Sequence, residues 1–103
     1  MSGVNYPYRY QYETVAASQT AQVLGGTGDT GDFIDRLVIT VNTAASAAVT
    51  LLDGATSIAI MPNSPGGGVG VYVVPLMMCS NTGPWKVTTG AGSTVVAVGI
   101  FSA

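Results

Sequence analysis

Hydrophobic and polar residues alternate along most of this chain in short runs, which are separated by clusters of glycine, proline, asparagine and aspartate. The clearest run extends from Phe33 to Val41, where Leu37, Ile39 and Val41 alternate with Val38 and Thr40. A hydrophobic pattern that repeats every two residues is typical of a β-strand, because successive side chains of a strand lie on opposite faces. The pattern therefore predicts a strand over residues 33–41.

Further runs of the same kind predict strands over residues 12–16, 21–24, 47–52, 56–61, 69–76, 85–89 and 94–101. The pair Asp53-Gly54 separates two of them and indicates a tight hairpin with a mirror-image turn. Pro75 lacks a backbone N–H, so it indicates an edge strand or the end of a strand. No segment has a convincing helical pattern, because the helix-tolerant AASAA stretch at 44–48 is short and follows a strong strand.

About eight short, evenly spaced strands without helical crossovers predict an all-β fold. We expect an antiparallel β-sandwich with a jelly-roll-like topology, and an immunoglobulin-like sandwich is the alternative. The 103 residues suffice for one domain. We expect residues 12–103 to form this domain and residues 1–11 to form an extended N-terminal arm.

The arm begins MSGVNYPYRYQY and has a tyrosine at every second position from residue 6 to residue 12. In an extended chain these rings share one face. They could pack on the domain's own core as a first strand, but Pro7 does not suit a central strand. Tyrosine is enriched at protein interfaces. We predict that the arm binds a neighbouring subunit. The predicted contact residues are Tyr6, Tyr8, Arg9, Tyr10 and Tyr12. Of these, Tyr12 is the residue most expected to belong to the domain itself.

Charged residues make up only 8% of the chain, against about 25% in an average protein. The net charge is −2, and Arg9, Arg36 and Lys86 are the only basic residues, so nucleic acid is not an expected partner. The longest apolar run, Val69 to Cys79, is too short to span a membrane, and no signal-peptide pattern is visible. A nearly uncharged surface suits a protein that lies against other protein, so the composition predicts an assembly role.

Candidate chemistry is sparse. The chain contains no histidine, which excludes Ser-His-Asp and Cys-His catalysis and histidine-based metal sites. The single cysteine, Cys79, excludes an internal disulfide and is predicted to be a buried small hydrophobe. The single tryptophan, Trp85, is predicted to pack in the core rather than to face a partner. We therefore expect neither an enzyme nor a cofactor.

The loop GGTGDTGD at 25–32 is the most acidic segment. Its Asp29-Thr30-Gly31 matches the catalytic triplet of aspartic proteases, so a protease of the retroviral type is a remote alternative. That family has apolar residues before the aspartate, whereas this chain has GGTG before it and Asp32 after the triplet. Asp29, Asp32 and Asp35 are also oxygen ligands of the kind that calcium prefers, but without EF-hand spacing. We expect an ordinary solvated loop.

Three stretches, YETVAASQTAQVLGGTGDTGDFIDRLVITV, LLDGATSIAIMPNSPGGGVGVYVVPL and GPWKVTTGAGSTVVAVG, resemble small proteins encoded beside the capsid genes of tailed bacteriophages. The resemblance covers residues 12–101 and includes no catalytic motif. It implies a head decoration or cement protein that binds the major capsid protein lattice, stabilises the head and self-associates as a dimer or trimer. Such a protein is made in the host cytoplasm and resides on the virion surface. The alternative is a tail or fibre adhesin module that binds a host glycan through exposed aromatic side chains.

Overall fold

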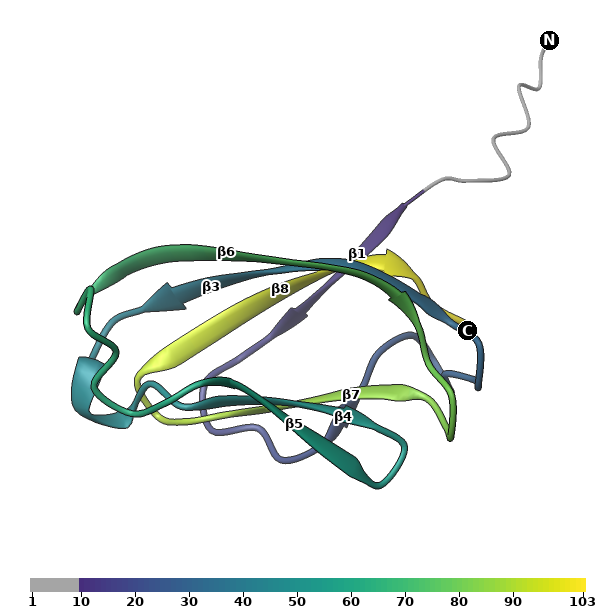
Figure 1. The fold of residues 1–103 in the computed structure, drawn as a ribbon, viewed down its shortest axis with the longest axis horizontal. Helices are drawn as coiled ribbons and strands as arrows, with labels where there is room; N and C mark the ends of the chain where they lie inside the picture. The colour runs from purple at the N-terminus through teal and green to yellow at the C-terminus, as the bar shows by residue number, and fades with distance from the viewer. Residues whose placement is uncertain (1–9) are drawn as a thin grey trace, which may run out of the picture.

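The computed structural model describes residues 10–103, which form two four-stranded antiparallel sheets packed as a sandwich (Figure 1). One layer holds β1 (Gln11–Val15), β8 (Ser93–Ile100), β3 (Phe33–Val41) and β6 (Gly70–Cys79). The other layer holds β2 (Gln22–Val23), β7 (Trp85–Thr89), β4 (Val49–Asp53) and β5 (Thr56–Met61). The predicted β-sandwich of eight strands is confirmed.

The strand order is β1-β8-β3-β6 in one sheet and β2-β7-β4-β5 in the other. Strand β1 therefore pairs with β8, β2 with β7, β3 with β6, and β4 with β5. This is the order obtained when a long hairpin of paired strands is rolled into two layers, which is the jelly roll. The immunoglobulin-like alternative is wrong, because its two sheets combine the strands in a different order.

Most strands begin and end close to where the alternation predicts. Strands β3, β5 and β7 match the predicted ranges, whereas β6 continues to Cys79, three residues beyond the predicted end. Pro75 lies within β6 and opposite Arg36 of β3. Because β6 is an edge strand with no second neighbour in its sheet, a proline is tolerated there without ending the strand.

The core lies between the sheets and is built from the inward positions of the alternating strands. Its fully buried members include Val15, Ile34, Leu37, Ile39, Val41, Val49, Leu51, Val87 and Val95. Trp85 is also in the core, with 1% of its surface exposed, which confirms the prediction that it packs internally. Its indole N–H donates to the backbone carbonyl of Asp32 at 2.8 Å, so the polar end of this large side chain is satisfied.

The predicted hairpin joins β4 to β5. Asp53 pairs with Thr56, so the two central residues of the turn are Gly54 and Ala55 rather than Asp53 and Gly54. Gly54 has a φ of 60° and Ala55 is not in the positive-φ region, which is the pattern of a type II′ turn. Gly54 also donates its N–H to the carbonyl of Pro84 at 3.0 Å, and this bond ties the hairpin to the start of β7.

The AASAA stretch forms a single 3₁₀ turn, Ala44–Ser46, between β3 and β4. Within residues 10–103, no helix has the length and apolar character needed to cross a membrane.

Candidate binding surface

The arm tyrosines that the structure describes are Tyr10 and Tyr12. Tyr12 lies in β1 opposite Val98 and has 74% of its surface exposed. Tyr10 precedes β1, is half exposed, and packs its ring against Phe33 with a centroid distance of 5.8 Å. Tyr6, Tyr8 and Arg9 lie outside the described residues, so their predicted contacts with a partner remain predictions.

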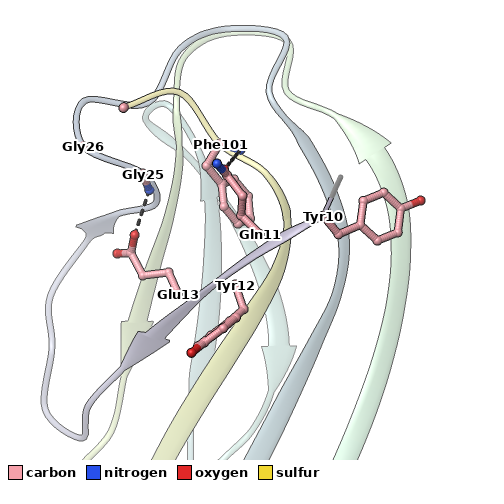
Figure 2. Close-up of a pocket in the computed structure, with 8 residues that line it drawn as sticks. Tyr10, Gln11, Tyr12, Glu13, Gly25, Gly26 and Phe101 are labelled. Atoms are coloured by element: carbon pink, nitrogen blue, oxygen red, sulfur yellow. Dashed lines mark hydrogen bonds between the residues drawn. The ribbon is translucent and has the colours of Figure 1, made fainter. Parts of the chain in front are cut away.

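The alternation predicted for the arm is present at its inner end (Figure 2). Gln11 and Glu13 point to the opposite side from the two tyrosines and bind the domain itself. The Gln11 side-chain oxygen accepts the N–H of Phe101 at 3.1 Å. The Glu13 carboxylate accepts the N–H of Gly25 at 2.8 Å and the side-chain amide of Gln22 at 2.7 Å. These bonds fasten β1 to the domain, and the tyrosine rings are left outside.

An open hollow of about 540 Å³ lies at this end of the molecule, between β1, the Gly25–Gly26 turn and the C-terminal residues (Figure 2). Tyr10, Tyr12 and Phe101 supply its aromatic lining. Gln11 and Glu13 also line it, but the hydrogen bonds to Phe101, Gly25 and Gln22 engage the Gln11 side-chain oxygen and both carboxylate oxygens of Glu13. The aromatic side chains of the hollow are therefore available to a binding partner, whereas the carboxylate oxygens of Glu13 already have hydrogen-bond partners within the domain.

A second surface lies on the outside of the β1-β8-β3-β6 sheet. Because the inward positions of β3 and β8 are buried, the intervening positions face away from the sandwich. Register places Val73 beside Val38 and Val38 beside Val96, in a row across three strands. We call this surface the valine face; it consists of Val38, Thr40, Val71, Val73, Met77, Thr94, Val96 and Val98.

Exposed hydrophobic side chains are concentrated on this sheet. Within residues 10–103, the large apolar side chains that are exposed belong to β1, to β6, or to the residue directly before either strand: Tyr10, Tyr12, Val69, Val71, Val73 and Met77. Val73 is 59% exposed and Met77 is 70% exposed. Strands β1 and β6 are the two edges of the same sheet, so exposed apolar side chains occur at both edges of this face, with Thr14, Arg36, Thr40 and Thr94 among its other outward residues.

The outer surface of the opposite sheet is different in kind. Its outward positions, identified by the same alternation and register, are Thr50, Leu52, Ser57, Ala59, Lys86 and Thr88. Small and polar side chains dominate there, as is usual for the solvated face of an antiparallel sheet. The two outer faces are therefore unequal, and the valine face is the one that lacks the composition of a solvated surface.

Cys79 is exposed, so the prediction that it is buried is wrong. The prediction rested on the apolar residues that surround Cys79 in the sequence. These residues form an edge strand, on which every second side chain faces outward. Cys79 holds such a position, opposite Phe33, and lines a shallow apolar depression with Tyr10, Phe33 and Ile100.

The three aspartates around the acidic loop each have hydrogen-bond or ion-pair partners within the domain, and Asp32 also accepts the backbone N–H of Asp29 at 3.0 Å. Asp29 accepts the N–H of Thr30 at 2.8 Å, Asp35 forms an ion pair with Arg36, and Asp32 accepts both the N–H and the hydroxyl of Ser102. Within residues 10–103, no three acidic or cysteine side chains converge as a metal site would require. Asp32 thus joins the loop to the end of the chain.

Asp53 is the acidic residue with the clearest structural role. The residue is 8% exposed, and its carboxylate accepts the backbone N–H groups of Asn81 and Thr82 at 2.9–3.1 Å, together with the Thr82 hydroxyl at 3.3 Å. These bonds, of which the Thr82 N–H is the largest cause, lower the pKa of Asp53 below its usual 3.8, although burial opposes them. The ionised carboxylate therefore stabilises the β6–β7 turn.

Sequence reasoning did not identify the valine face, although a signal was present. The segment VYVVPLMMC is apolar at both odd and even positions, which is typical of a strand covered on both faces. In the structure β6 is an edge strand and its outward side chains are exposed. The mismatch between its composition and its position could be recognised only when the sheet order was known.

Comparisons of the chain with protein-family models, with curated proteins and with solved structures find no significant match.

Proposed function

We propose that this protein is a structural component of a tailed-bacteriophage virion, a decoration or cement protein that binds the major capsid protein lattice and stabilises the head. The observation that carries the proposal is the confinement of the exposed large hydrophobic side chains to one sheet and its two edges. Contiguous exposed apolar surface on a protein is typical of contact with other protein. The resemblance in sequence supplies the viral setting.

The β1 edge is the part of the surface that we assign to the capsid. Tyr12 projects from β1, Tyr10 packs on Phe33, and the hollow of about 540 Å³ lies beside them. Large aromatic side chains that are already held by a rigid strand lose little conformational freedom on binding, which favours affinity. Many copies on one lattice would also bind more firmly than a single contact implies.

The low charge of the chain is consistent with this role. Removal of a charged side chain from water is costly. Because only 8% of the residues are charged, few charged side chains lose contact with water when neighbouring subunits cover the protein. The one ion pair found in residues 10–103, Arg36 with Asp35, lies within the chain itself. If the surrounding surface were buried, Arg36 and Asp35 would therefore each keep an oppositely charged partner.

The experiment uses particles of the virus that encodes the chain. Virions are purified, heads and tails are separated, and each fraction is analysed by quantitative mass spectrometry and by cryo-electron microscopy. We expect the protein on heads, in a fixed ratio to the major capsid protein, and we expect heads that lack it to release DNA at a lower temperature. Absence of the protein from purified heads would refute the proposal.

A second candidate function is glycan binding by a tail or fibre adhesin module. The observation that favours it is the aromatic hollow, because sugar rings stack on exposed tyrosine side chains. Against it, the carboxylate oxygens of Glu13 and the side-chain oxygen of Gln11 are engaged internally. Location on tails together with saturable binding to a glycan array would establish this function instead.

A further inference from the structure

Strand β6 has the composition of a buried strand but the position of an edge strand. Its sequence GVYVVPLMMC contains no charged residue. On the inner side Tyr72, Val74, Leu76 and Met78 pack against the core while remaining only partly buried. On the outer side Val71, Val73 and Met77 are exposed. Strands that are apolar on both faces are normally covered on both faces, so the outer side of β6 is expected to be covered by protein.

The surface next to β6 extends this apolar area without adding an unpaired charge. Val38 and Thr40 of β3 lie directly beside Val73 and Val71, and Val96 and Thr94 of β8 follow in the same rows. Arg36 of β3 lies on the same face, between Val98 and Pro75, and it pairs with Asp35. A surface with no excess of either charge does not select a charged partner, but it is compatible with a copy of itself.

The size of the face is sufficient for association. Strands spaced about 4.8 Å apart, each with about eight residues rising about 3.3 Å, give the four-stranded sheet an outer face of roughly 500 Å² before side-chain relief is counted. Two such faces together reach roughly 1,000 Å², which is the lower limit for a specific interface. The face is also comparable with the largest apolar patch of a typical monomer, about 300–600 Å².

The free edge of β6 favours stacking of faces over pairing of edges. Pro75 lies in the middle of the strand and has no N–H to donate to an added strand. The pairing with β3 is irregular beside it, between Ile34 and Arg36, and Met77 has a φ of 52°. Prolines and bulges of this kind protect edges from pairing with other strands. The rows of valine and threonine remain available for contact through side chains.

We infer that the valine face is the contact between two copies of this chain, which associate face to face about a two-fold axis. In such a contact each residue meets the same surface of its partner, so a self-compatible patch is the only requirement. This inference deepens the proposed assembly role, because it names the surface through which the chain contacts a second copy of itself; Tyr12 lies opposite Val98 at the border of this surface, and the hollow beside β1 remains for the capsid.

The test is the mass of the full-length protein in solution, measured by size exclusion with light scattering and by sedimentation equilibrium. Val73→Asp places a charge at an exposed position of the valine face, on its β6 side. Ala59→Asp is the matched control, since Ala59 is an exposed outward position on β5, the edge strand of the opposite sheet. We expect a dimer for the wild type and for Ala59→Asp, and a folded monomer for Val73→Asp.

A second variant guards against loss of folding. Val71→Thr with Val73→Thr keeps the β-branched shape and the strand propensity but replaces one methyl group of each valine with a hydroxyl. We expect the dissociation constant of the dimer to rise by about tenfold or more, because four buried valines per dimer are changed.

Each contrary outcome has a separate meaning. A dissociation constant of roughly 100 µM is the weak limit for a useful interface, so a wild type that is monomeric at this concentration or above overturns the inference. A dimer that survives Val73→Asp, or that is broken equally by Ala59→Asp, overturns it as well. None of these results bears on whether the protein is found on purified heads. Conversely, a dimer that dissociates as expected but is absent from virions refutes the proposed function and leaves the interface intact.

Discussion

The indole N–H of Trp85 donates a hydrogen bond to the backbone carbonyl of Asp32 at 2.8 Å. Trp85 begins β7 in one sheet, and Asp32 directly precedes β3 in the other. The side-chain carboxylate of Asp32 in turn accepts the N–H and hydroxyl of Ser102, which follows β8. One residue therefore connects the buried tryptophan, the acidic loop and the end of the last strand.

Trp85→Phe removes this bond and part of the buried ring. We expect the free energy of unfolding to fall by about 2 kcal/mol, because the Asp32 carbonyl loses a partner and a small cavity remains. Urea unfolding followed by far-UV circular dichroism measures the change, since the tryptophan signal is lost in the variant. A change below about 0.5 kcal/mol would contradict the structural role assigned to the bond.

Asp53→Asn tests the carboxylate that holds the β6–β7 turn. The pKa of Asp53 is lowered in the folded protein, so its contribution to stability is complete above the unfolded value near 3.8 and is lost as the pH falls through the lower folded value. At pH 7 we expect the variant to lose about 1–3 kcal/mol. The difference between wild type and variant should shrink below about pH 4. A difference that is constant from pH 7 to pH 2 would contradict the assignment.

Deletion of residues 1–9 tests the arm. The deletion should end before Tyr10, because Tyr10 packs on Phe33 and Gln11 bonds to Phe101 within the domain. We expect the melting temperature to change little and binding to decoration-free heads to be lost. Binding is measured by co-sedimentation with heads. Full binding by the shortened protein would remove Tyr6, Tyr8 and Arg9 from the proposed contact.

Tyr12→Ala tests the part of the predicted contact that the structure describes. Because Tyr12 is largely exposed, we expect a stability change within about 0.5 kcal/mol and at least about tenfold weaker binding to heads if the ring is an anchor. Thr14→Ala, at the next outward position of β1, is the matched control. Equal binding by all three proteins would exclude β1 from the contact.

Asp29→Asn separates the protease alternative from a structural role. The carboxylate of Asp29 accepts only the N–H of the adjacent Thr30 within the described residues, and the residue is exposed. We expect the variant to assemble on heads as the wild type does and to unfold within about 0.5 kcal/mol of it. Peptide cleavage by the wild type that disappears in the variant would establish the protease alternative instead.

The sequence by itself determined the class of the fold and most of its strands. Alternation in segments such as 33–41 and 85–89 depends on neighbouring residues only, because a strand places adjacent side chains on opposite faces whatever its partners are. The hairpin at Gly54 was likewise predictable, since a positive φ is a local requirement that glycine meets. The burial of Trp85 was predictable because a large aromatic side chain in a small sandwich usually packs in the core.

Only the tertiary structure decided which strands lie at the edges and which faces are covered. Cys79 and Val73 were indistinguishable from core residues in the sequence, because hydrophobicity alone does not state whether a second layer lies over a side chain. The order β1-β8-β3-β6 places β6 at an edge and leaves its outer side chains exposed. Sheet order depends on pairing between residues far apart in the chain, such as Val38 with Val73, and no local pattern encodes that pairing.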